Sequence, residues 1–137
     1  YLIVEDYLDV LYAFYNQVKT VTTYECYQIP PKVFIFKNLI NLTFNLGYYN
    51  IESNYIDDLI KHKTLQKIKM IMTIYSESDC NILDKISSLV QAKTSVQLNV
   101  YINKSFNTDY LEIISKFEKK LEEIKRLTKN KFEFTIK

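Results

Sequence analysis

Few residues in this 137-residue chain have the types and spacing that catalysis or metal binding requires. The only histidine is His62, in the segment Lys61-His62-Lys63, and no Ser-His-Asp or Cys-His arrangement can be assembled around it. Cys26 and Cys80 have no CxxC spacing, so together with His62 they offer too few ligands for a metal site. We therefore expect no metal and no cofactor, and we interpret His62 as a polar residue at a helix end.

Carboxylates and glycine also argue against an enzyme. The paired acids Asp57-Asp58 and Glu122-Glu123 lie near lysines in helical segments, which predicts solvated surfaces with i,i+4 partners such as Lys61 and Arg126. Phosphate-cradling loops need several glycines so that the backbone can approach the ligand. The sequence contains a single glycine, Gly47, which we interpret as a turn after a strand. The sequence therefore predicts a protein that is not an enzyme.

The charge balance excludes a strong overall attraction to polyanions. The chain carries 18 basic and 16 acidic side chains, a formal net charge of +2. This value gives no whole-chain electrostatic footprint for nucleic acid or for an anionic membrane, although a local basic surface remains compatible with it. No apolar run approaches the length of a membrane-spanning helix. Two cysteines without disulfide spacing predict an intracellular setting.

Alternation of apolar and polar residues predicts four strands, each with one solvent-exposed side, at residues 42–46, 68–74, 98–102 and 132–136. Between them, apolar residues recur three and four positions apart, which predicts helices around Ile56 and Leu59, from Ile82 to Val90, and from Leu111 to Ile124. In the first 32 residues we expect a helix over residues 8–18 and a strand over residues 21–27. The chain is one domain or a fragment of a larger array.

The polar positions of the four strands decide the architecture. A sheet covered by helices on both sides has strands that are apolar at nearly every position, and these strands are not. Helices can therefore cover only one side of the sheet. Two architectures fit: a solenoid of strand–helix repeats with a parallel sheet, or an open two-layer α+β sandwich with a mixed or antiparallel sheet. Taking Leu39, Leu65, Ser95 and Lys129 as equivalent starts gives units of about 26, 30 and 34 residues, in the range of repeat arrays.

The segments Leu39-Ile40-Asn41-Leu42-Thr43-Phe44 and Leu65-Gln66-Lys67-Ile68-Lys69-Met70 each resemble the L-x-x-L-x-L core of leucine-rich repeats. The resemblance covers residues 33–137 and is nearest to the ribonuclease-inhibitor-like class. It implies a horseshoe-shaped solenoid that binds a protein on its concave sheet. The sequence departs from the family in having only Asn103 at the asparagine position and in lacking a leading leucine at Ser95 and Lys129.

We therefore expect a non-catalytic interaction scaffold that binds a protein partner through the side of the sheet that helices leave uncovered. The expected partner-binding residues are the alternate positions of the strands: Asn41, Thr43, Asn45, Lys67, Lys69, Ile71, Gln97, Asn99, Tyr101 and Glu133. Interfaces place aromatic anchors such as Tyr101 among polar neighbours. The alternative is an RNA-binding or ribonucleoprotein component that uses the same side, because open sheets with exposed aromatics stack bases. A purely structural piece of a larger assembly is the third possibility.

Overall fold

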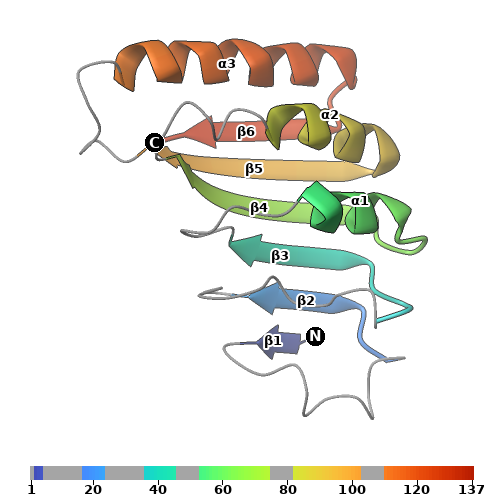
Figure 1. Ribbon diagram of the computed structural model, residues 1–137. Coiled ribbons are helices and arrows are strands. Elements are labelled where there is room, and N and C mark those ends of the chain that lie inside the picture. The colour runs from blue at the N-terminus through green and yellow to red at the C-terminus, as the bar shows by residue number, and fades with distance from the viewer. Residues whose placement is uncertain (1, 5–16, 24–35, 46–52, 75–81, 103–109) are drawn as a thin grey trace.

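The fold centres on a six-stranded, all-parallel β-sheet in which the strands lie in chain order (Figure 1). The computed structural model describes residues 2–4, 17–23, 36–45, 53–74, 82–102 and 110–137. The strands are β1 (Leu2–Val4), β2 (Thr20–Thr23), β3 (Asn41–Asn45), β4 (Lys67–Ile74), β5 (Ser95–Ile102) and β6 (Phe132–Ile136). Each strand pairs with the next one along the chain.

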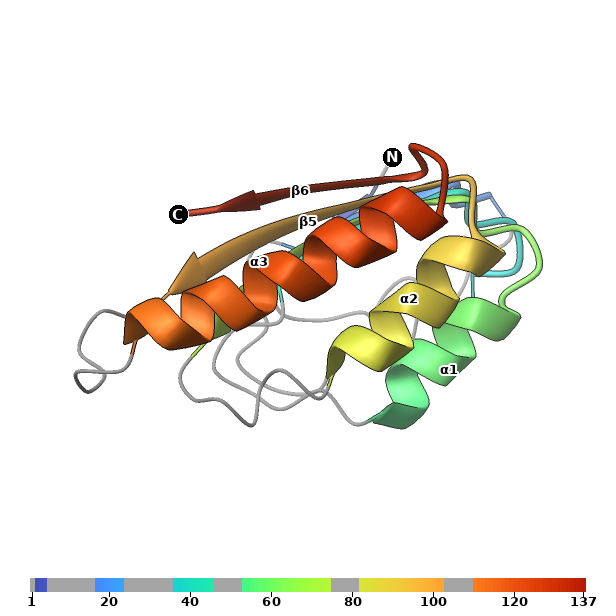
Figure 2. The same ribbon diagram turned by 90° about the horizontal axis from the view of Figure 1, so that it is seen from above.

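Three helices of the described segments lie on the same side of this sheet (Figure 2). They are α1 (Ser53–Lys61), α2 (Ile82–Ala92) and α3 (Tyr110–Leu127). Helix α2 contacts both α1 and α3, and α3 packs against β6. The turn that follows α3 uses two left-handed residues, Lys129 at φ 50° and Asn130 at φ 69°. The chain is therefore an α/β protein with a parallel sheet.

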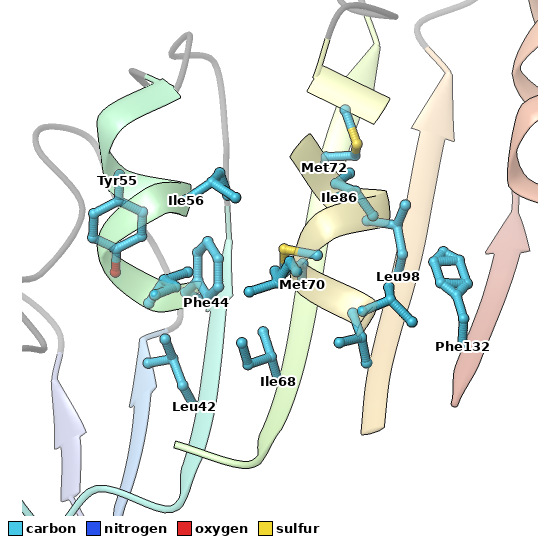
Figure 3. Close-up of a cluster of buried hydrophobic side chains, with 14 of the residues drawn as sticks. Leu42, Phe44, Tyr55, Ile56, Ile68, Met70, Met72, Ile86, Leu98 and Phe132 are labelled. Carbon is cyan, nitrogen blue, oxygen red and sulfur yellow. The ribbon is translucent and has the colours of Figure 1, made fainter. Parts of the chain in front are cut away.

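The core lies between the sheet and the helices (Figure 3). Alternate residues of β4, among them Ile68 and Met70, are buried, whereas their neighbours Lys67 and Lys69 are exposed. The helices contribute one apolar stripe each, which in α3 includes the fully buried Phe117. Each strand and each helix buries only one side. For this reason apolar residues recur at every second position in the strands and at every third or fourth position in the helices.

Strand register gives the true spacing of the units. Residues aligned across the sheet are Leu2, Val21, Leu42, Ile68, Val96 and Phe132. Asn41, Lys67 and Ser95 are aligned partners, so the residue equivalent to Leu39 and Leu65 is Lys93, two positions before Ser95. The expected start at Ser95 was therefore wrong, while Lys129 is aligned with Lys93 by the pairing of β5 and β6. The units beginning at Leu39, Leu65 and Lys93 span 26, 28 and 36 residues.

The first third of the chain is described only in part. The predicted strand over residues 21–27 is present as β2 from Thr20 to Thr23, and its remainder lies outside the described residues. Residues 8–16 of the predicted N-terminal helix also lie outside them. Gln17 and Val18 are described and are not helical, so the prediction was wrong for these two residues; the buried Val18 lies two positions before β2. Strand β1, Leu2–Val4, was not predicted.

Candidate functional site

The side of the sheet opposite the helices, here termed the uncovered face, carries all ten residues that the sequence indicated. Its members come from alternate positions of β3 to β6, and the register sets them in rows across the sheet. One row consists of Thr22, Thr43, Lys69, Gln97 and Glu133 in β2 to β6, and its register continues to Ile3 of β1. A second row holds Asn45, Ile71, Asn99 and Thr135. No helix of the described segments lies over these rows (Figure 2).

Exposure varies across this face. Lys67, Lys69, Tyr101 and Glu133 are exposed, while Ile71 and the amide and hydroxyl side chains of the two rows are half-buried, apart from the exposed Thr135. Tyr101 is one of the few large apolar side chains that remain exposed in the described residues, at 39%. The face therefore offers a polar, hydrogen-bonding surface with one aromatic anchor, as expected for a surface that contacts another macromolecule.

Side-chain contacts connect neighbouring strands on this face. Asn41 Nδ2 donates to Thr20 Oγ1 over 3.2 Å, and Thr135 Oγ1 donates to Asn99 Oδ1 over 2.9 Å. The Lys137 ammonium lies 5.6 Å from the centroid of the Tyr101 ring, a cation–π arrangement. These contacts restrict the motion of the polar side chains that make them.

The edge of the sheet where the strands begin contains a hydrogen-bonded network around His62. The ring Nε2 lies 2.9 Å from the carbonyl oxygen of Phe36, and the backbone N–H of Leu65 donates to Nδ1 over 3.3 Å. Nδ1 can accept this bond only when it carries no proton, so Nε2–H is the donor to Phe36. Thr64 Oγ1 donates to the carbonyls of Lys37 and Leu39 nearby. His62 thus joins the turn after α1 to the chain that precedes β3, which is a structural role.

Lys93 is the most unusual polar residue of the described segments. Its side chain is buried, with an exposure of 4%, at the position where the two preceding units have Leu39 and Leu65. Its Nζ donates to the carbonyl of His62 over 2.9 Å and reaches that of Ile60 at 3.5 Å. These carbonyls belong to the last turn of α1 and the residue after it, where a cation is favourable. Burial of the ammonium lowers the pKa of Lys93 from its usual 10.5.

The other chemistry-bearing residues do not form a site in the described part of the chain. Asp57 pairs with Lys85 of α2, with Nζ to Oδ1 at 2.9 Å, instead of the predicted partner Lys61. Glu122 and Glu123 are both exposed on α3. The described residues contain no group of three or more potential metal ligands. Cys26, Cys80 and Gly47 lie outside the described residues.

Lys93, Thr64 and the bonding role of His62 were not foreseen from the sequence. Placing the start of the third unit at Ser95 hid the equivalence of Lys93 with Leu39 and Leu65. Counting back two positions from each strand start would have revealed it, because Asn41 and Lys67 both follow a leucine by two.

No family model, curated protein or solved structure matches the chain. Among the helices of the described segments, none combines the length and the apolar character needed to span a bilayer. The class that the structure defines is an α/β protein whose parallel sheet has helices on one side.

Proposed function

We propose that this chain is a solenoid of strand–helix repeats, similar to leucine-rich repeats, and that it binds a protein partner through the uncovered face. Sequential strand order supports the solenoid, because in a repeat array each unit contacts only its neighbours. The equivalent positions Leu39 and Leu65 are both fully buried and precede β3 and β4 by the same two residues. The partner is an intracellular protein, and no cofactor takes part.

The observation that carries the proposed binding role is the row Thr22, Thr43, Lys69, Gln97 and Glu133, which crosses five strands on the uncovered face. Adjacent strands lie about 4.8 Å apart, so this row extends over about 19 Å. From Thr22 to Glu133 the row is polar, while Ile71 and Tyr101 provide apolar contact one and two rows away. A surface of this kind suits a protein segment of which a few anchor residues supply most of the binding energy.

Base stacking on the same face is the second candidate, and one observation weighs against it. The Lys137 ammonium already lies over the Tyr101 ring, so a base that stacked on that side would have to displace it. No other aromatic side chain of β3 to β6 belongs to the uncovered face, since Phe44 and Phe132 are fully buried and Phe134 packs against the core.

The test is a charge reversal of the two exposed lysines of β4. Peptide ligands are selected from a displayed random library against the whole chain, and their affinities are measured for Lys67→Glu/Lys69→Glu. The matched control is Lys119→Glu/Lys120→Glu on the exposed side of α3, which changes the net charge equally.

We expect the selected peptides to lose on the order of tenfold affinity or more in the β4 variant and to keep it in the α3 variant. Both variants should keep the melting temperature of the parent, since all four lysines are exposed. Peptides that bind the β4 variant as tightly as the parent would contradict the proposal, as would an equal loss in the α3 control.

A further inference from the structure

Charge is strongly segregated toward the edge where the strands begin. This edge, here termed the basic edge, consists of the segments that enter β2 to β6: residues 17–20, 36–41, 61–67, 91–95 and 126–132. It holds half of the chain's 18 basic residues and none of its 16 acidic ones. Its basic residues are Lys19, Lys37, Lys61, Lys63, Lys67, Lys93, Arg126, Lys129 and Lys131. The near-neutral total charge conceals this asymmetry.

Parallel strand order arranges these segments along a line. All strands point the same way and follow one another across the sheet, so their starting ends form one edge (Figure 1). At about 4.8 Å per strand, the starts of β2 to β6 extend over about 19 Å. Every basic side chain of the edge except Lys93 is exposed. The ion pairs found in the described residues, Lys85 with Asp57 and Lys116 with Glu112, both lie away from it.

Helix ends explain only part of this clustering. A cation in the last turn of a helix is favoured by the helix dipole, which accounts for Lys61 in α1 and Arg126 in α3. The effect falls off within the last turn. Lys131 lies in the turn after α3, beyond the last turn of that helix, and Lys19 and Lys37 lie in the segments that lead directly into β2 and β3. Clustered like charges destabilise a fold by mutual repulsion, and an anion bound along the row of cations would relieve that repulsion.

We propose that the basic edge binds a single-stranded nucleic acid through its phosphate backbone, without reading its sequence. A line of cations matches a linear polyanion, whose phosphates recur along one dimension. The aromatic residues of the edge, Phe36 and Phe132, are fully buried and leave no stacking platform for bases. The described edge also presents no protruding helix or ribbon that could enter a groove of a duplex.

An anionic membrane fits this edge less well than a nucleic acid. Interfacial attachment requires a contiguous apolar surface beside the cations. The large apolar side chains exposed on the edge are Ile40, at the start of β3, and Leu127, at the end of α3, with the starts of β4 and β5 between them. Single exposed apolar residues of this kind are ordinary surface features.

This inference is independent of the proposed protein-binding face, because it rests on the strand starts and the turns before them. Lys67 belongs to both surfaces and is therefore left unchanged in the test. The test compares Lys37→Gln/Lys63→Gln/Lys131→Gln on the basic edge with Lys116→Gln/Lys119→Gln/Lys120→Gln on α3. Both variants remove three positive charges, so a difference between them reports position and not total charge.

The measurement is fluorescence anisotropy of a labelled oligouridylate with the whole chain between about 50 and 200 mM salt. Each phosphate neutralised on a single strand contributes about 0.7 to the slope of log K against log salt. We expect the basic-edge variant to bind more weakly. Its slope should be shallower by about 2, because three lost phosphate contacts each contribute about 0.7. The α3 variant should keep the slope of the parent.

Four outcomes would overturn the inference. They are no binding of oligouridylate at low salt, an equal loss in both variants, tighter binding to phosphatidylserine vesicles than to oligouridylate, and equal competition by poly-glutamate. The last two would assign the edge to a membrane or to an acidic protein. A loss caused by Tyr101→Ala but not by the basic-edge variant would instead place nucleic acid on the uncovered face. Thermal unfolding should show the basic-edge variant to be at least as stable as the parent, because repulsion is relieved.

Discussion

At the scale of single residues, Lys93 shows how one position can serve the fold in two chemically different ways. Leu39 and Leu65 fill the same place before β3 and β4 with aliphatic side chains that are fully buried. Lys93 fills it with an aliphatic stem and carries its ammonium to carbonyls at the end of α1. The stem packs like a leucine, while the charge is desolvated, which lowers the pKa of the amine.

A lowered pKa makes the stability of the fold depend on pH in a defined direction. Between the lowered folded-state pKa and 10.5, the unfolded chain binds a proton at Lys93 that the folded chain has released. Unfolding then takes up a proton, so the contribution of Lys93 to the free energy of unfolding rises with pH across this window. Below this window Lys93 is protonated in both the folded and the unfolded chain. The full cost of burying its charge then lowers the free energy of unfolding.

The corresponding prediction concerns Lys93→Met, which keeps an unbranched apolar stem and removes the titration. Urea unfolding of the parent and the variant is measured from about pH 7 to about pH 10. We expect the parent to gain stability relative to the variant as pH rises toward 10.5. Because the same tyrosines and lysines titrate in both proteins, the difference isolates Lys93. A difference that stays constant or falls with pH would show that its ammonium is not desolvated.

At the scale of secondary-structure elements, the turns into β3, β4 and β5 are each fixed by backbone hydrogen bonds to the segment that enters the preceding strand. The carbonyl of Lys19 accepts N–H bonds from Ile40 and Asn41, and that of Ile40 accepts bonds from Gln66 and Lys67. In the same way, the carbonyl of Gln66 accepts N–H bonds from Thr94 and Ser95, where the chain enters β5. His62 adds a side-chain bond between the same two turns, so the edge is stabilised by both backbone and side-chain contacts.

His62→Ala tests the contribution of that side chain to the edge. The substitution leaves the carbonyl of Phe36 and the N–H of Leu65 without their partner. Loss of one partner from a part-buried hydrogen bond costs about 1–3 kcal/mol, so we expect the free energy of unfolding to fall by that amount. The control is Lys63→Ala, an exposed neighbour whose change should stay within about 0.5 kcal/mol. Equal effects of the two substitutions would refute the bridging role of His62.

The sequence predicted the elements well where periodicity was strong. The alternation in residues 68–74 and 98–102 marks β4 and β5, and the apolar spacing from Leu111 to Ile124 marks α3. It placed all ten expected residues on one face, because side chains two apart in a strand share a side. It could not fix the register: a polar Lys93 at an apolar position made Ser95 look like the start of a unit. Residue 57 was given the wrong partner because its lysine comes from another helix, 28 positions along the chain.

At the scale of the whole molecule, the two surfaces proposed for binding follow from one feature, the parallel sheet with helices on one side. Parallel order brings all strand starts, and the basic residues beside them, to one edge, and the single helical layer leaves the polar positions of the strands uncovered on the other side of the sheet. The overall charge of +2 predicted neither surface. Placement along the fold, and not total composition, determines what each surface can bind.

The rate of thiol labelling tests whether the side of the sheet opposite the helices is open to solvent. Single cysteines replace adjacent residues of one strand that point to opposite sides, Val96→Cys and Gln97→Cys, in a Cys26→Ser/Cys80→Ser background. Val96 is 1% exposed beneath the helices, whereas Gln97 belongs to the row on the uncovered face. We expect native-state labelling at the half-buried residue 97 to be much faster than at residue 96, where labelling has to wait for unfolding. Slow labelling at both positions would show that residue 97 is covered too, and would contradict the account.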